Sequence, residues 1–156
     1  MDAILITSME CYSRGTDLTV DARFRLSPLK VLTQHVSAEL FFNKRLIKTF
    51  EMKIPYHFAR RELQIQPVLS LEKVRSGSHR VRLVLTRTKP PSSEKSEKSM
   101  TIHYDAKIEM LLDEDLPRVK SIGEFSPVEV VSSKAKELYR QMEERRRREI
   151  AMSRER

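Results

Sequence analysis

The sequence predicts an all-β protein, an antiparallel β-sandwich of about seven strands followed by a C-terminal α-helix. Two observations carry this prediction. Short runs of Val, Ile, Leu, Phe and Thr recur along the chain, alternate with polar residues and end at polar residues or Pro, as strands do. The last part of the chain loses this alternation and becomes rich in Arg and Glu, which is typical of a solvated helix.

At 156 residues the chain has the length of one domain with a core of its own. Its single cysteine, Cys11, has no partner for an internal disulfide, so we expect a reducing compartment, the cytoplasm. We interpret Cys11 as a half-buried residue of the first strand rather than a nucleophile. The N-terminus carries Asp2 and only a short apolar run, so we expect neither a signal peptide nor membrane association.

The first two strands differ in how clearly they show an inward face. Residues 3–11 form a strand whose inward face is ambiguous. Residues 18–26 alternate cleanly and end before Pro28. The predicted inward side chains of this second strand are Leu18, Val20, Ala22, Phe24 and Leu26.

Residues 36–54 predict a β-hairpin that supplies much of the core, and two registers compete for it. A two-residue loop at Asn43 and Lys44 would place Glu39 opposite Lys48. That register gains one exposed ion pair, which is worth ~0.2–1 kcal/mol.

A three-residue loop over residues 43–45 would instead pair Phe42 with Leu46 and Ala38 with Phe50. We predict this second register, because it collects the larger apolar set on one face and each large buried side chain contributes ~1.5–3 kcal/mol. The other face then keeps an apolar pair, Phe41 and Ile47, which needs a cover. The apolar segment near Phe125 is one candidate for that cover.

Three further strands follow the hairpin. We expect them at residues 65–71, 79–88 and 100–112, with Val81, Leu83 and Leu85 pointing inward on the second. Residues 89–99 lie between the last two strands and are rich in Pro, Ser and charged residues. We expect them to form a mobile insert. The alternative is that the two strands extend into this insert as a ribbon.

The chain therefore divides into a sandwich domain over residues 1–131 and a C-terminal helix over residues 132–156. In the helix, Leu138, Tyr139 and Met142 follow helical spacing and predict docking of the first half. The second half is polar on all sides, and we expect it to project into solvent.

The segments FFNKRLIKTFEMKIP and QPVLSLEKVRSGSHRVRLVLT resemble the hairpin and the Gly-x-His-x-Val-x-Val strand entry of immunoglobulin-like sandwiches of the bacterial and archaeal adhesion type. The resemblance covers residues 18–112. It lacks the Cys, Trp, Cys signature of antibody domains. It implies an immunoglobulin-like fold and a scaffold for binding rather than for a reaction. Many such proteins are secreted, but the basic charge and the lack of a signal peptide depart from that location.

Charge is unevenly distributed along the chain. Residues 44–89 carry twelve Lys and Arg against three Asp and Glu, residues 103–129 carry three against seven, and residues 134–156 carry nine against five. A basic band of this kind attracts phosphates or an acidic protein face.

The residues offer no catalytic, cofactor or metal site. The four histidines, among them His79 and His103, are scattered over different predicted elements, and the three glycines cannot form a phosphate-binding loop. We therefore expect neither enzymatic activity nor a small-molecule substrate.

Two function hypotheses lead, and a small hydrolase or metal protein is left only as a remainder. The leading one is a non-catalytic interaction module or adaptor that binds a protein partner or a second copy of itself; the alternative is a nucleic-acid-binding or ribonucleoprotein-associated protein. The first would use Phe41, Ile47, Leu138, Tyr139 and Met142, and the second Lys44, Arg45, Arg60, Arg61, Arg80, Arg82, Arg145, Arg146, Arg147 and Arg148.

Overall fold

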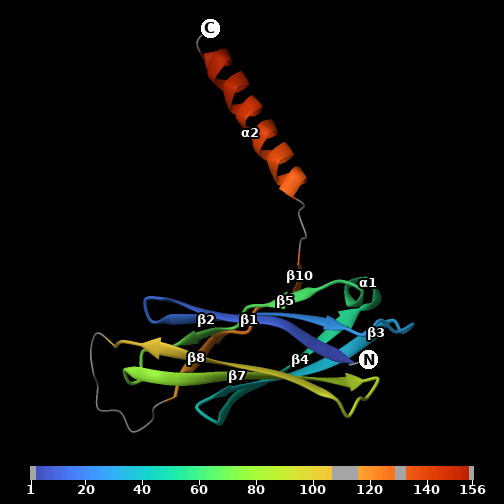
Figure 1. Cartoon of the computed structure of the whole chain (residues 1–156), viewed down its shortest axis with the longest axis vertical. Helices are drawn as coiled ribbons and strands as arrows, with labels where there is room; N and C mark the ends of the chain where they lie inside the picture. The colour runs from blue at the N-terminus through green and yellow to red at the C-terminus, as the bar shows by residue number, and fades with distance from the viewer. Residues whose placement is uncertain (1–2, 107–115, 129–132, 155–156) are drawn as a thin grey trace.

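The computed structural model describes residues 3–106, 116–128 and 133–154, and within the last range the side chains of residues 140–150. Two antiparallel sheets face each other as a sandwich, and a helix lies beyond them (Figure 1). In chain order the elements are β1 (Ile4–Arg14), β2 (Asp17–Leu26), β3 (Thr33–Phe42), β4 (Arg45–Pro55), α1 (Tyr56–Ala59), β5 (Leu63–Ile65), β6 (Val68–Ser70), β7 (Gly77–Lys89), β8 (Lys95–Tyr104), β9 (Arg118–Ser121), β10 (Ser126–Pro127) and α2 (Ser133–Arg154).

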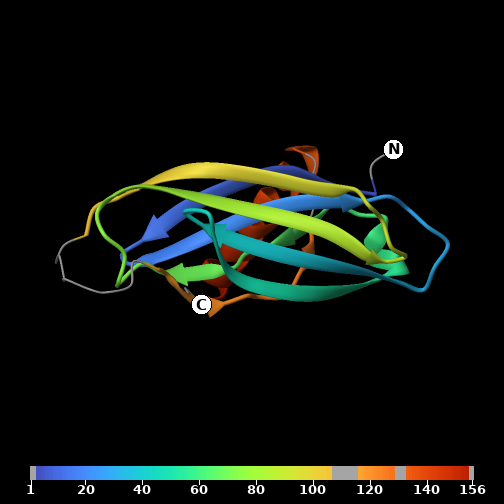
Figure 2. The ribbon, with the colours of Figure 1, turned by 90° about the horizontal axis from the view of Figure 1, so that it is seen from below.

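Figure 1 shows the two layers from the side, and Figure 2 looks onto the face of the sheet formed by β4, β3, β7 and β8. Sheet B has the order β4-β3-β7-β8. In sheet A, β1 pairs with one side of β2, while β5 and β6 pair with different parts of its other side; β10 then pairs with β5, and β9 with β6. This arrangement confirms a sandwich of antiparallel sheets with a C-terminal helix.

The core lies between the two sheets and follows the predicted alternation. The side chains at alternate positions of β2, from Leu18 to Leu26, are all buried, as are Val81, Leu83 and Leu85 of β7. Burial of each large side chain in this set contributes about 1.5–3 kcal/mol, so these alternating positions favour the folded sandwich strongly.

The described residues form ten strands rather than about seven. Pro67 accounts for one of the extra strands, because it interrupts the single strand expected over residues 65–71 and leaves β5 and β6, while its carbonyl accepts a bond from the N–H of Val20. The other two extra strands, β9 and β10, come from the segment after residue 115, for which the sequence analysis expected only packing along the sandwich.

A β-bulge explains the ambiguous inward face of the first strand. The pairing of β1 with β2 shifts between Ile6 and Ser8. Ile4 and Ile6 point into the core before the bulge and Met9 does so after it, so the period of two is broken within one strand.

The hairpin of β3 and β4 combines the two registers that competed in the sequence. Its loop has two residues, Asn43 and Lys44, with φ angles of 49° and 72°, so the expected three-residue loop is wrong. A bulge between Leu40 and Phe41 then shifts the pairing, and Ala38 lies opposite Phe50 as predicted. Positive φ at both positions is the turn geometry that matches the twist of paired strands.

The bulge also exchanges the faces of two neighbouring residues. Leu46 was expected in the core, but it lies opposite Phe41 on the outer face and is 51% exposed. Ile47 was expected on the outer face, but it is half-buried against the core. The apolar pair on the outer face is therefore Phe41 with Leu46.

The segment expected to be a mobile insert is shorter than residues 89–99. Strand β7 runs to Lys89 and β8 begins at Lys95, so both strands extend into the insert as the ribbon alternative proposed. The last predicted strand ends at Tyr104, and its expected continuation at residues 107–112 lies outside the described residues.

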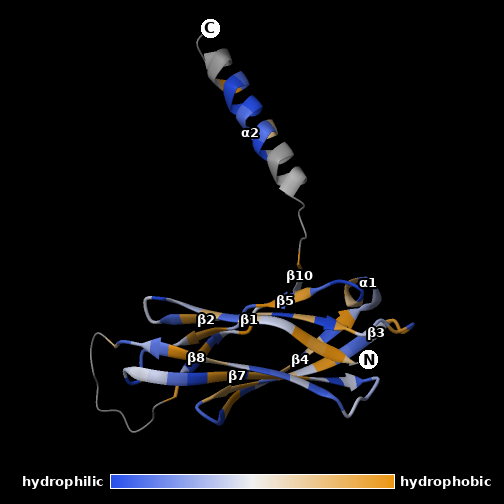
Figure 3. Cartoon of the chain, in the orientation of Figure 1, coloured by the Kyte–Doolittle hydropathy of each residue, from blue (hydrophilic) through white to orange (hydrophobic). Residues whose placement is uncertain are grey.

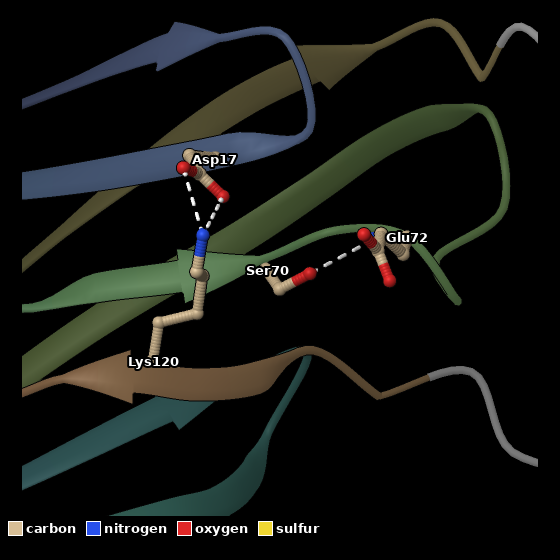
Figure 4. A network of polar contacts seen from close by, with 4 residues as sticks. All are labelled: Asp17, Ser70, Glu72 and Lys120. Carbon is tan, nitrogen blue, oxygen red and sulfur yellow. Dashed lines mark hydrogen bonds and ion pairs between the residues drawn. The ribbon is translucent and has the colours of Figure 1, made fainter.

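The chain after residue 115 returns to sheet A and not to the outer face of sheet B. Lys120 of β9 forms an ion pair with Asp17 of β2 across β6, with Nζ–Oδ distances of 3.0 and 3.1 Å (Figure 4). In the same region the backbone N–H of Glu72 donates to Ser70 Oγ at 3.5 Å. The side chain of Phe125 packs edge-on against Phe58. This segment is therefore not the cover of Phe41.

Helix α2 stands clear of both sheets in Figure 1, and Figure 3 shows its middle as mostly hydrophilic. Met142 is 60% exposed, and residues 140–150 are all exposed. The side chains of Leu138 and Tyr139 lie outside the described residues, so docking through them stays a prediction. No helix among the described residues is long and apolar enough to span a membrane.

Candidate anion-binding surface on sheet B

The outer face of sheet B carries a hollow of about 300 Å³ beside the β3–β4 turn. We call it the hairpin hollow. Four cationic side chains and one carboxylate line it together with an aromatic ring and a hydroxyl. Its residues are Phe41, Lys44, Arg80, Arg82, Glu97, Lys98 and Ser99.

Strand alternation places most of these side chains on one face. In β7 the odd-numbered residues from His79 to Leu85 point into the core, so Arg80 and Arg82 point outward. Strand β8 pairs Arg82 with Ser99, and β3 pairs Phe41 with Arg82 on the other side. Three adjacent strands therefore position the hollow on a rigid support.

The guanidinium of Arg82 lies between an aromatic ring and a carboxylate. Its Cζ is 4.3 Å from the centroid of the Phe41 ring, and its Nε is 3.9 Å from Glu97 Oε2. The Arg82 and Glu97 side chains are 44% and 62% exposed, so this ion pair contributes at most about 1 kcal/mol. The Phe41 ring orients the Arg82 guanidinium. Because the ion pair with Glu97 is weak, a bound anion can replace Glu97 with little loss of free energy.

Arg80 is oriented by a second contact in the hollow. Its Nη2 donates to Ser99 Oγ at 2.8 Å, across the β7–β8 pair. A guanidinium has five N–H donors, so Arg80 keeps donors for a ligand while this bond holds its side chain in place.

The turn that carries Lys44 is fixed to β7. Asn43 Nδ2 lies 2.8 Å from His79 Nδ1, and Asn43 Oδ1 accepts from the backbone N–H of Arg80 at 2.8 Å. The other ring nitrogen of His79, Nε2, lies 2.7 Å from the carbonyl of Arg75; because a carbonyl only accepts, Nε2 donates and Nδ1 accepts from Asn43. His79 is buried and hydrogen-bonded, as a core-edge histidine.

Lys44 occupies a backbone conformation that disfavours it. At φ 72° a residue with a Cβ costs about 1–2 kcal/mol relative to right-handed geometry, and Gly is the usual residue at this place in the turn. Strain of this kind persists where the surrounding structure enforces it, and it is most common at functional sites.

The structure brings together four of the residues singled out in the sequence. Phe41, from the protein-binding set, lies in the hairpin hollow with Lys44, Arg80 and Arg82 from the nucleic-acid set.

The remaining candidates lie elsewhere. Arg45 is exposed opposite Phe42, and Ile47 packs against the core. Arg60 and Arg61 follow α1 at the other end of the sandwich, where the Arg60 guanidinium lies 6.0 Å from the Tyr56 ring centroid. The four consecutive arginines of α2, Arg145, Arg146, Arg147 and Arg148, are exposed.

Three residues of the hollow escaped the sequence analysis. Glu97, Lys98 and Ser99 fell within the expected mobile insert, yet they belong to β8. The alternation that runs on from Ile102 extends back to Ser96, and following it would have placed Glu97 and Ser99 on the outer face.

Cys11 is half-buried on β1, as expected from the sequence. Burial raises the pKa of its thiol to about 11, so the neutral thiol prevails near neutral pH and is a weak nucleophile. Within the described residues, no three His, Cys, Asp or Glu side chains gather as metal ligands.

Comparison with known proteins adds no family to this geometry. No protein-family model matches the chain, and no curated protein matches it.

Proposed function

We propose that this protein is a non-catalytic interaction module that binds an acidic segment of a partner protein at the hairpin hollow. The observation that carries the proposal is the convergence of four cationic residues around one exposed hollow, with a single exposed carboxylate among them. Charge-assisted hydrogen bonds from arginine to carboxylate are strong and directional, and they suit recognition of Asp and Glu side chains.

The apolar side chains beside the hairpin hollow favour a protein as the ligand. Phe41 and the exposed Leu46 lie side by side on the outer face and offer apolar area next to the cations. Interfaces between proteins combine an apolar centre containing aromatic residues and arginine with a polar rim. A partner segment that alternates acidic and apolar residues would match this surface.

We also propose that the sandwich is immunoglobulin-like. The order of its strands supports this. Sheet B, in the order β4-β3-β7-β8, corresponds to the C′-C-F-G sheet of such domains. In the proposed immunoglobulin-like arrangement, β1, β2 and the β5–β6 pair of sheet A would be strands A, B and E. Folds of this type commonly serve as scaffolds for recognition, and a reducing compartment such as the cytoplasm suits the unpaired Cys11.

The test is fluorescence anisotropy with a labelled peptide rich in Asp and Glu, and with its Asn and Gln counterpart as the ligand control. Arg82→Glu and Arg80→Glu should each weaken binding of the acidic peptide by at least about tenfold, which corresponds to about 1.4 kcal/mol. Arg60→Glu is the matched protein control, because it makes the same charge change on an exposed residue at the other end of the sandwich. It should change the affinity by less than about twofold if local contacts rather than net charge decide binding.

Two results would contradict the proposal. Equal losses in Arg82→Glu and Arg60→Glu would mean that net charge alone attracts the peptide. Equal affinity for the acidic and amide peptides would mean that the hollow does not recognise carboxylates. Lys44→Gly adds a third check, because it removes a cation and relieves backbone strain, so it should bind more weakly while unfolding at a higher urea concentration.

Nucleic-acid binding is the second candidate function, favoured by the exposed run from Arg145 to Arg148 on α2. Consecutive helix residues point in directions about 100° apart, so these four side chains surround the helix. Labelled RNA and duplex DNA in the same titration test this candidate. Tight binding that falls steeply with salt and is lost when Arg146 and Arg147 become Glu would support it over the protein partner.

A further inference from the structure

One edge of the sandwich is tied together by a hydrogen bond between the two sheets, and at the other edge β4 lacks a second strand partner among the described strands. At the first edge the backbone N–H of Ile6 in β1 donates to Ser96 Oγ in β8 at 2.9 Å, which ties the two sheets together. At the opposite edge β4 pairs only with β3 among the described strands. The two edges therefore differ in whether they can accept another strand.

A groove of about 550 Å³, larger than the hairpin hollow, lies between this edge of β4 and residues 122–125. Its lining combines apolar and charged side chains. The apolar ones are Phe50, Met52, Phe58, Ile122 and Phe125, and the charged ones are Glu51, Lys53 and Glu124. An edge strand beside such a groove is the geometry in which proteins add a further strand.

The edge is protected over only part of its length. Near the hairpin turn, the bulge at Ile47 disrupts regular pairing, which is a common device against edge-to-edge contact. From Thr49 to Pro55 the pairing with β3 is regular. A second strand can therefore pair with this part of β4.

We propose that a second copy of this chain pairs with it through β4, antiparallel about a two-fold axis that passes near Met52. In this register Glu51 lies opposite the partner's Lys53, Lys53 lies opposite the partner's Glu51, and Phe50 lies opposite the partner's Ile54. In this register odd-numbered residues face odd-numbered residues and even-numbered face even-numbered. Their side chains therefore lie on the same face of the sheet, and the backbone N–H and C=O groups that point away from β3 can form hydrogen bonds with those of the second copy. The two copies use the same patch, as a two-fold interface requires.

Charge selects this register over its neighbours. If the axis moved to Glu51, that carboxylate would face its own copy, and if it moved to Lys53, two ammonium groups would face each other. Both arrangements place like charges directly opposite, which is destabilising. Glu51 and Lys53 are exposed, and the imidazole of His35, at 2.7 Å from Glu51 Oε1, faces the same side. An acid and a base two residues apart are complementary to the same pair in a second copy that runs antiparallel. This self-complementarity is the reason to propose a second copy as the partner.

The experiment is sedimentation velocity of the full chain over a range of concentrations, with single and double charge exchanges. The wild type should show a concentration-dependent dimer. Glu51→Lys and Lys53→Glu should each weaken it by at least about tenfold, because like charges then face each other twice per dimer. The double variant Glu51→Lys/Lys53→Glu should dimerise again, because both pairs are restored with their signs exchanged.

Mixing the two single variants gives the sharpest result. Glu51→Lys presents two bases and Lys53→Glu presents two acids, so each should be monomeric alone and the mixture should form a heterodimer. Arg82→Glu is the control for self-association through the hairpin hollow and should leave the dimer unchanged. Circular dichroism of every variant checks that the exposed substitutions preserve the fold.

Three results would overturn the proposal. A wild type that stays monomeric at all soluble concentrations shows that β4 does not pair with a second copy. A dimer that is unaffected by either single charge exchange forms through another surface. A mixture of the single variants that remains monomeric shows that Glu51 and Lys53 do not face each other.

Discussion

Replacement of Asn43 by Ala tests the contacts that hold the β3–β4 turn against β7. The Asn43 side chain donates to His79 and accepts from the Arg80 backbone, and each bond contributes about 1 kcal/mol. Its φ of 49° is tolerated by Asn and Gly, whereas Ala adds about 1 kcal/mol of strain. The free energy of unfolding should therefore fall by about 3 kcal/mol in Asn43→Ala and by about 2 kcal/mol in Asn43→Gly.

Urea unfolding followed by far-ultraviolet circular dichroism measures this loss, because the chain contains no Trp as a fluorescent probe. A thermal scan of Asn43→Ala should show a midpoint roughly 6–12 °C lower. A double-mutant cycle with His79→Ala isolates the side-chain bond, and its coupling should be about 1 kcal/mol. Stabilities within about 0.5 kcal/mol of wild type for both the Ala and Gly variants would refute the reasoning, since surface changes without such contacts give values of that size.

Three further outcomes follow from single contacts. Ser96→Ala should lose about 1–2 kcal/mol in urea unfolding, because the N–H of Ile6 loses its acceptor at the edge where β1 meets β8; wild-type stability would show that water replaces it. Thiol labelling of Cys11 at mildly alkaline pH should be slow in the native protein and fast in urea, because burial raises its pKa to about 11; rapid native labelling would contradict its burial. The hydrogen bond from His35, together with nearby lysines, lowers the pKa of Glu51 below its ordinary 4.5. Ionised Glu51 therefore stabilises the fold above that pH, and this contribution is lost as the pH falls further, so the urea midpoint of Glu51→Gln should depend less on acid than that of the wild type.

The alternation of apolar and polar residues in the sequence predicts much of the sandwich. The period of two identifies the core residues of β2, β3 and β7 correctly, because burial of one face is a property of a strand whatever it packs against. The prediction fails where pairing shifts by one residue. The bulges at Thr7 and Ile47 follow from the fit of two strands to each other, and no single strand contains that information.

The candidate site divides in the same way. Phe41, Lys44, Arg80 and Arg82 were singled out in the sequence for two different functions. Their convergence in one hollow depends on β3 and β7 being neighbours, a pairing between segments about forty residues apart. Residues 97–99 were hidden by a composition typical of loops, because the pairing with β7, rather than β-propensity, makes them a strand.

The sequence by itself determined an antiparallel β-sandwich with a charged C-terminal helix, a single half-buried thiol and a strongly basic middle third. Alternation, helical periodicity and charge are local properties, so they can be read without knowing which elements touch. Only the tertiary structure decided which face Leu46 and Ile47 take, which basic side chains share a surface, and which edge strand lacks a second partner among the described strands. Those three outcomes depend on the register and neighbours of each strand, which are fixed only when the two sheets pack together.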